Sequence, residues 1–443
     1  MGIIEILLFI AILVFVLCYN INRILGLPPG PTPWPIVGNV LQLSMDDLDK
    51  RGNYGLSFEE NDWYRSQRRF TLHTLRNLGV GKPIIKDTIT MLSNRTVDLL
   101  RNTNGAAIEL KPYLTNAVGN VISQLTFGFI RSPDDNELNR FQSLVAEVME
   151  HFNEAMMQLL DVCSFLRHFD PIFGFGLKTT IHRNDAILEF IHKQLDDHKK
   201  AINYDQEPMN YVDAFLHEIH KREIEGIKDE FTEKQCVAAI YDLFVAGLET
   251  IVITLRFSFL FLLNYPEIQK RIHREIDDNI GTERDITMDD QKILPYTCAF
   301  LQEVYRVGYV ANLNLLRVTL EDVNCEGYKL RKGTKVIPQF PCIHMDESIY
   351  PRPELLIPER HLKDGQFVRD EHVTGFSVGK RSCLGESLAR MEVFMFFTSL
   401  MQKFRFEPEG PYPPEVKMQR SALRAPAPFK IRAIDRTTES SLI

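Results

Sequence analysis

The segment from Thr232 to Asn264 constrains the fold of this chain more than any other stretch. Thr232 followed by Gln235 matches a capping box, a pattern that begins a helix. From there apolar residues fall on nearly every face until Asn264, and Pro266 begins a second helix that we expect to run to about Ile280. A helix that is apolar all round is buried, so we expect the first helix to cross the middle of a large protein.

The rest of the sequence predicts a mainly α-helical fold with a minor β component. Helical spacing of apolar residues, with charged opposite faces, covers the ranges 62–101, 138–160, 180–200 and 211–222. Short strands are expected between Val323 and Pro341, with turns at Gly327 and Gly333, and a last helix follows Cys383. With 443 residues, the chain can bury a large core in one big domain or two ordinary ones.

The N-terminal residues 1–22 predict a membrane anchor. The stretch is apolar from Ile6 to Tyr19 and just long enough to cross a hydrocarbon core, which needs about 20 residues. A cleaved signal peptide is the alternative, but no basic region precedes the stretch and no small-residue cleavage site follows it. Because Arg23 follows the span, the positive-inside rule weakly favours a cytosolic position for the rest of the chain.

A proline-rich hinge follows, over residues 23–39. Five prolines and two glycines lie between Pro28 and Gly38, and proline denies the backbone the donors that a helix needs. Residues 40–443 are then the folded domain. The whole chain has a net charge of −8, which argues against a nucleic-acid partner, and its seven cysteines, an odd number scattered without CxxC spacing, argue against a disulfide scaffold or a zinc ribbon.

The stretch FSVGKRSCLG, residues 376–385, surrounds a single cysteine with residues of specific use. Gly379 permits a tight turn with positive φ, and Cys383 then lies at the start of a helix, where free N–H groups favour a thiolate. Gly385 leaves space for a flat ligand, Phe376 can shield the sulfur, and Arg381 suits a carboxylate of that ligand. A flat ligand with iron and carboxylates is haem. For Cys383 taken alone, a packed thiol or a reactive nucleophile remains open.

This five-position pattern resembles the haem-binding signature of the cytochrome P450 superfamily. Glu303 and Arg306 in FLQEVYR are similar to the ExxR element of that family, and Arg360 in LIPERHL stands where the family has a third partner. The resemblance implies that these charges brace the cysteine loop rather than catalyse. His361 replaces the usual aromatic residue. A solvated surface pair is the ordinary explanation of such charges when they are taken alone.

The sequence AGLET, from Ala246 to Thr250, resembles the oxygen-activation motif of the family's central helix. The resemblance implies that Ala246 and Gly247 leave room for O₂ above the iron, and that Thr250 and Glu249 manage protons. A packing glycine and a threonine bonded back to the carbonyl four residues earlier would explain the same residues without catalysis.

Two further arginines match positions that bind the propionates of haem b (iron protoporphyrin IX) in the family. Arg317 lies in NLNLLRVT and Arg68 in WYRSQRRF, and with Arg381 they are expected to hold the cofactor while Cys383 ligates the iron. Trp63 stands five residues before Arg68, whereas the family has four. On a helix this places the two side chains about 100° out of register.

The resemblance runs from PPGP to about Phe406 and is closest to microsomal members that oxidise xenobiotics, steroids or fatty acids. It implies a haem-thiolate monooxygenase in the endoplasmic reticulum membrane, with its catalytic domain facing the cytosol, that inserts one atom of O₂ into an apolar small molecule. Electrons would come from NADPH through a flavoprotein reductase. Arg65, Arg69 and Lys380 are candidates for its docking face, with a solvated charge cluster as the alternative.

The chain departs from the family after its hinge. Only 23 residues separate Asn39 from Trp63, roughly fifty fewer than expected, enough for several secondary-structure elements. The missing part would include the first strands of the small sheet. A catalytically silent, truncated isoform that binds haem poorly is therefore an alternative, and a peroxide-driven or isomerase-type haem protein is another. Three interpretations are open for the phenylalanine-rich residues 164–176: they line a pocket entrance, dip into the bilayer or belong to the core. No residue in this stretch identifies the substrate.

Overall fold

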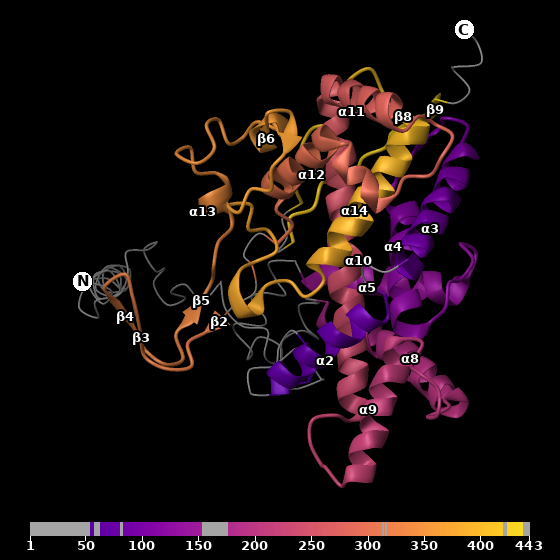
Figure 1. Cartoon of the computed structure of the whole chain (residues 1–443), viewed down its shortest axis with the longest axis vertical. Coiled ribbons are helices and arrows are strands. Elements are labelled where there is room, and N and C mark those ends of the chain that lie inside the picture. Colours follow the sequence, from indigo (N-terminus) through magenta and orange to yellow (C-terminus); the bar gives the residue numbers. More distant parts are fainter. Residues whose placement is uncertain are drawn as a thin grey trace, which may run out of the picture.

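A computed structural model describes residues 54–56, 63–79, 83–152, 176–311, 314, 317–419 and 423–436. The predicted membrane anchor, the proline-rich hinge, nearly all of the shortened segment before Trp63 and all but the last residue of the phenylalanine-rich stretch 164–176 lie outside the described residues. The described part of the chain is mainly α-helical with a minor β component, as the sequence predicted (Figure 1).

The helices cover most of the described chain. In sequence order they are α2 (Trp63–Asn77), α3 (Pro83–Arg101), α4 (Lys111–Phe127), α5 (Asn136–Phe152), α8 (Leu177–Ala201), α9 (Tyr211–Glu225), α10 (Glu233–Asn264), α11 (Pro266–Asn279), α12 (Pro295–Gly308), α13 (Pro341–His344) and α14 (Glu386–Lys403). Single 3₁₀ turns lie at Met288–Lys292, Pro358–His361 and Gly379–Arg381.

Helix α10 crosses the centre of the molecule, which confirms the prediction for its apolar segment (Figure 1). It packs against α4, α5, α8, α12 and α14. Among the described helices, α10 is the one whose length and composition would allow it to span a membrane. However, 72% of its most apolar stretch is buried inside the protein. Its composition therefore reflects a position in the protein core.

The predicted start of α10 is correct, but only half of the capping box is present. The Thr232 hydroxyl accepts a hydrogen bond from the Gln235 backbone N–H at 3.2 Å. The Gln235 side chain does not reach back to Thr232, whose own N–H donates to the Glu230 carbonyl. Instead, the Gln235 amide makes two hydrogen bonds with the backbone of Gly55, at 2.9 and 3.1 Å. This side chain therefore ties the chain before α2 to the central helix.

Helix α4 was not predicted from the sequence. Most of its side chains are buried, since it packs between α3, α5, α9 and α10. Burial on many sides removes the alternation of apolar and polar faces by which the other helices were recognised. The range 62–101, in contrast, contains two helices, α2 and α3, and the last described residue after α2 is Gly79 with φ of 117°.

The strands form small antiparallel sheets. The predicted strands after Val323 are confirmed: β3 (Val323–Cys325) pairs with β4 (Tyr328–Leu330), and β5 (Lys335–Val336) pairs with β2 (Arg317–Val318), which was not predicted. Gly327 and Gly333 have φ near 84° and 83° in the expected turns. A pair β6 (Leu362–Lys363) and β7 (Gln366–Phe367), and a sheet in the order β1 (Ala107–Ile108), β9 (Ile431–Asp435), β8 (Phe404–Pro408), were not predicted.

Candidate functional site

The loop before α14 forms the turn that the glycine spacing predicted. Gly379 has φ of 76° and begins a 3₁₀ turn that ends at Arg381. The Ser382 N–H donates to the Gly379 carbonyl at 3.0 Å, and the Cys383 N–H donates to the Phe376 carbonyl at 2.7 Å. Only a residue without Cβ adopts such a φ at low cost, so Gly379 is required for the bend that brings Cys383 to the start of α14.

The Cys383 side chain is exposed at the end of this turn, three residues before α14 begins. The surrounding protein raises the pKa of its thiol through desolvation, and the N–H of Gly385 acts in the opposite direction. The N–H at the start of the helix therefore favours the thiolate, as expected. Desolvation by the surrounding protein disfavours the thiolate more strongly. Coordination to a metal ion deprotonates a thiol outright, so this cysteine suits a metal ligand better than a free nucleophile.

Two of the three arginines predicted to bind propionates, Arg68 and Arg317, reach the Cys383 loop from other segments, and the third, Arg381, belongs to the loop itself. Arg68 of α2 donates to the Ser382 carbonyl at 2.7 Å, and Arg317 of β2 donates to the Ser377 hydroxyl at 2.6 Å. Burial lowers the pKa of Arg381, and the positive charges of Arg68 and Arg317 lower it further. Like charges gathered at one loop fit an anionic ligand with two carboxylates.

Tyr64, which sequence reasoning missed, occupies the position expected of Trp63. Trp63 is 41% exposed, whereas Tyr64 is 8% exposed and lies one helical turn before Arg68. The Tyr64 hydroxyl donates to the Lys380 carbonyl at 3.2 Å, and the Arg381 guanidinium lies 3.2 Å from the centre of the Tyr64 ring. The spacing of four residues from Arg68 was the signal that identifies it.

The loop and the start of α14 leave an open, largely apolar surface beside these cations. A Cβ placed on Gly385 or on Gly379 would meet no atom within 4 Å. Leu384 and Leu388 beside them are only half buried. The Phe376 ring contacts Tyr305 at a centroid distance of 5.3 Å. A flat apolar ligand with two carboxylates and a metal fits this combination of open glycines, arginines and an exposed thiol, and haem has those properties.

On the central helix, Ala246 is the residue that leaves open space. Its side chain is exposed, whereas most of α10 is buried. For Gly247 the expectation needs correction, because a Cβ there would lie 3.0 Å from the Cδ1 atom of Ile122 in α4. Gly247 therefore permits close packing of α10 against α4. Thr250 donates its hydroxyl hydrogen to the Ala246 carbonyl at 2.6 Å, one turn earlier.

Glu249 is buried in α10, whereas Ala246 is exposed. The Glu249 Oε1 atom lies 3.6 Å from the Nζ atom of Lys111 at the start of α4. Burial raises the pKa of Glu249, and the charge of Lys111 opposes this. The same lysine contacts Glu150 at 2.5 Å. The structure therefore separates Glu249 from Thr250, since neighbouring residues on a helix point about 100° apart.

The Glu303 and Arg306 pair lies fully buried behind the cysteine loop, not on a solvated surface. Two hydrogen bonds of 2.7 and 2.9 Å join their side chains. Arg306 also donates to the carbonyls of His344 and Pro353 at 2.7 and 2.8 Å. Burial opposes the charge of Glu303, but the hydrogen bonds from Arg306 and His361 outweigh it and lower the pKa to about 2. The bracing role implied by the resemblance is consistent with these contacts.

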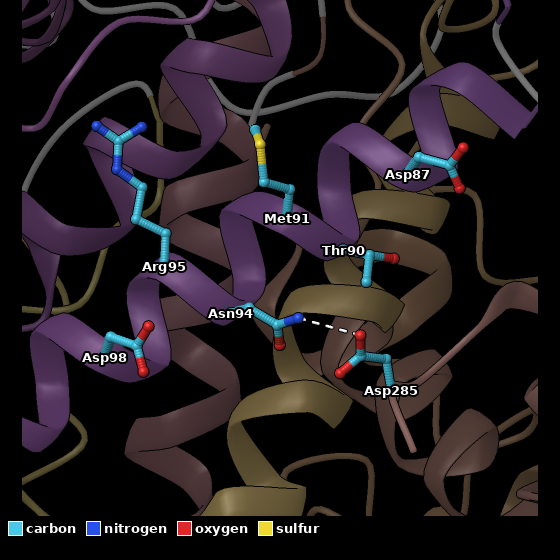
Figure 2. A pocket seen from close by; sticks show the side chains of 7 residues that line it. All are labelled: Asp87, Thr90, Met91, Asn94, Arg95, Asp98 and Asp285. Carbon is cyan, nitrogen blue, oxygen red and sulfur yellow. Dashed lines mark hydrogen bonds between the residues drawn. The ribbon is translucent and has the colours of Figure 1, made fainter.

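A surface hollow of about 540 Å³ lies along α3, away from the cysteine loop (Figure 2). Figure 2 shows Asn94 turned toward Asp285, which accepts its hydrogen bond at 3.1 Å. The lining residues are mostly polar: Asp87, Thr90, Met91, Asn94, Arg95, Asp98 and Asp285. None of the predicted site residues lines this hollow, so it is separate from the candidate site.

Comparison with known proteins agrees with this site. Residues 44–433 match the family described as Cytochrome P450. "Probable cytochrome P450 CYP36A1" of Caenorhabditis elegans is 45% identical over 486 aligned positions, which cover 97% of this chain and 99% of that protein. Cytochrome P450 2J5 of Mus musculus is 34% identical, covering 87% of this chain and 76% of that protein. Cytochrome P450 2D10 of Mus musculus is 31% identical, covering 92% of each.

The matched region includes the cysteine loop, the central helix and the buried Glu303 and Arg306 pair, and it extends over most of the chain. Similarity of this extent, together with a site that fits haem b, establishes the family and its cofactor. The chain therefore belongs to the cytochrome P450 family and is a haem-dependent monooxygenase.

Proposed function

We propose that Cys383 is the iron ligand of a haem b group, and that the enzyme inserts one oxygen atom from O₂ into an apolar small molecule of the xenobiotic, steroid or fatty-acid class. The observation that carries the proposal is that Arg68 and Arg317 reach the loop that presents the Cys383 thiol and that already contains Arg381. When bound, haem with a thiolate ligand supplies the O₂ chemistry. The protein residues hold it, orient it and deliver protons.

Each arginine has a separate position from which to hold the cofactor. Arg68 and Arg317 contact the loop through Ser382 and Ser377, and both can turn one N–H toward a propionate, since a guanidinium has five donors. Arg381 is fixed against the Tyr64 ring. Gly385 would allow the flat face of the ligand to approach the backbone.

Protons would be delivered from α10 by Thr250 and Glu249. The Thr250 hydroxyl donates to the Ala246 carbonyl, so its oxygen retains lone pairs that can accept a hydrogen bond from water. Burial raises the pKa of Glu249, which favours the protonated carboxyl that a proton donor needs. Because the two side chains point to different sides of the helix, we infer that water connects them.

Electrons would come from NADPH through a flavoprotein reductase that docks on the cysteine side of the cofactor. Arg65 and Arg69 are exposed on α2. Lys380, whose carbonyl accepts from the Tyr64 hydroxyl, is exposed on the cysteine loop. These three cations lie on adjacent segments and form a candidate basic docking face. The apolar residues 1–22 support attachment to the endoplasmic reticulum membrane, with residues 40–443 in the cytosol.

The test is the carbon monoxide difference spectrum of the reduced, membrane-expressed protein, with Cys383→Ala as control. A thiolate-type Soret band that disappears in the C383A variant is the expected result. Absence of haem, or a band without thiolate character, would assign the chain to the catalytically silent isoform instead.

A further inference from the structure

We propose that His361, rather than Arg360, is the third member of the buried pair Glu303 and Arg306, and that it positions the Cys383 loop through them. The assignment rests on contacts behind the loop and gives His361 a positioning role, not contact with cofactor or substrate. It concerns the loop that carries the proposed iron ligand, and in that respect it rests on the proposed function.

The two neighbouring side chains contact Glu303 in different ways. His361 is 1% exposed, and its Nε2 atom lies 2.8 Å from Glu303 Oε2. Because a carboxylate only accepts hydrogen bonds, this nitrogen must carry the hydrogen. The Nε atom of Arg360 lies 3.4 Å from Glu303 Oε1 and has no hydrogen-bond partner among the described residues. Its Nη2 donates to the Arg352 carbonyl at 2.7 Å. Arg360 thus contributes charge, whereas His361 contributes the hydrogen bond.

The hydrogen bond from His361 completes the environment of a buried charge. Glu303 Oε1 accepts from Arg306 Nη2 and from the Ile357 N–H at 3.0 Å. Glu303 Oε2 accepts from Arg306 Nε and from His361. Removal of the imidazole would leave Oε2 with a single donor in a site without exposure to water, and a charged oxygen in that position is costly. Glu303 and Arg306 would then shift to find another partner.

A shift of Arg306 would reach the cysteine loop through a chain of hydrogen bonds. Arg306 donates to the His344 carbonyl, and the His344 Nε2 atom accepts from the Thr374 N–H at 3.0 Å. The Thr374 carbonyl in turn accepts from the Ser377 N–H at 2.7 Å. Ser377 lies in the turn that leads to Cys383 and has a positive φ of 64°. The buried pair is therefore coupled to the backbone that aims the sulfur.

His361 also faces the segment that enters this loop. Its Nδ1 atom lies 3.8 Å from Asp370 Oδ2, which accepts from the Tyr350 hydroxyl at 2.8 Å. The Asp370 carbonyl accepts from Gln302, the residue before Glu303 on α12. His361 thus stands between a carboxylate of the helix and a carboxylate of the loop segment. A phenylalanine would fill the same space but would offer Glu303 no donor.

The experiment compares His361→Phe and His361→Gln with Arg360→Gln as the matched control, each in the full-length protein. The first readout is amide hydrogen exchange of residues 374–383, measured without haem. We expect H361F to speed exchange there by about 10-fold or more, and R360Q by less than about 3-fold, because a lost buried hydrogen bond lowers the local opening free energy. H361Q can donate an N–H to Glu303 and should restore most of the protection.

The second readout is the thiolate-type fraction of the carbon monoxide difference spectrum, which should follow the order wild type, R360Q, H361Q, H361F. Equal or larger effects of R360Q than of H361F would overturn the assignment, and so would an H361Q variant no better than H361F. If H361F does not fold while R360Q and H361Q do, H361F is again the most damaging change, and this result supports the assignment. A wild type without the thiolate band, but with the exchange differences intact, would refute Cys383 as ligand and leave the role of His361 standing.

Discussion

The Arg381 guanidinium lies over the face of the Tyr64 ring, 3.2 Å from the ring centre. This contact joins helix α2 to the cysteine loop, and the Tyr64 hydroxyl adds a hydrogen bond to the Lys380 carbonyl of the same loop. A planar guanidinium stacked on an aromatic face is held in orientation as well as in place. Tyr64 therefore positions one of the cations that surround the proposed cofactor.

Truncation of Tyr64 is expected to weaken this junction. Tyr64→Ala should destabilise the fold by about 1–2 kcal/mol, since it removes the stacked ring and the hydroxyl donor, and it should speed haem loss. Tyr64→Phe, which keeps the ring, should cost less. Trp63→Ala is the control, because Trp63 is 41% exposed and should tolerate the change. Urea unfolding and haem retention on a desalting column measure these effects. A larger effect of W63A would contradict the assignment.

A methyl group at Gly247 is expected to disturb the packing of α10 against α4. The added Cβ would lie 3.0 Å from Ile122 Cδ1, so Gly247→Ala should destabilise by about 1–3 kcal/mol despite the better helix propensity of alanine. Ile122→Val removes that Cδ1 atom. The double variant should recover much of the loss in a double-mutant cycle followed by thermal unfolding. Simple additivity of the two changes would show that Ile122 is not the obstacle.

The stability of the protein should fall below pH 6.5 because of two buried histidines. Burial, reinforced by nearby arginine charge, lowers the pKa of His344 and of His273 from 6.5 to about 4. The unfolded chain therefore binds more protons than the folded one between pH 6.5 and 4, and stability is lost as the pH falls through that window. Each histidine adds about 1.4 kcal/mol per pH unit to the slope.

His344→Gln checks the contribution of one of these groups, since a glutamine oxygen can still accept from the Thr374 N–H but does not titrate. The free energy of unfolding, measured in urea from pH 7 to 4, should decline less steeply in H344Q than in the wild type. Parallel curves for the two proteins would mean that His344 is not held neutral in the folded state.

The buried carboxyl of Glu392 in α14 is expected to reduce stability at neutral and alkaline pH. Glu392 is fully buried, and neither of its oxygens has a hydrogen-bond partner among the described residues. Desolvation raises its pKa well above 4.5, so the unfolded chain releases a proton that the folded chain keeps, and stability falls as the pH rises above 4.5.

Glu392→Met, of similar length and without charge, should therefore stabilise the protein by about 1–3 kcal/mol at pH 7, with a smaller gain at pH 5. Thermal or urea unfolding at the two pH values measures the difference. A variant less stable than the wild type at both values would show that the carboxyl makes a favourable contact.

Several features were recognisable in the sequence because they depend on residues close together in the chain. The φ of Gly379, the helix start at Thr232 and the turns at Gly327 and Gly333 follow from local backbone chemistry. Helix α4 was missed because burial on many sides leaves no periodic polar face. The Gln235 side chain was assigned to the helix cap, yet it binds Gly55, a residue that no local pattern connects to it.

The site itself divides in the same way. The sequence determined which helix crosses the core, and its motifs, through the family resemblance, identified the loop with the proposed ligand cysteine and the arginines proposed to surround the cofactor. The tertiary structure showed that Tyr64 rather than Trp63 faces Arg381, a choice at which the spacing from Arg68 only hinted, and it alone decided that His361 rather than Arg360 hydrogen-bonds Glu303. These outcomes depend on how packed elements are rotated against one another, and a rotation is set by contacts between residues far apart in the chain.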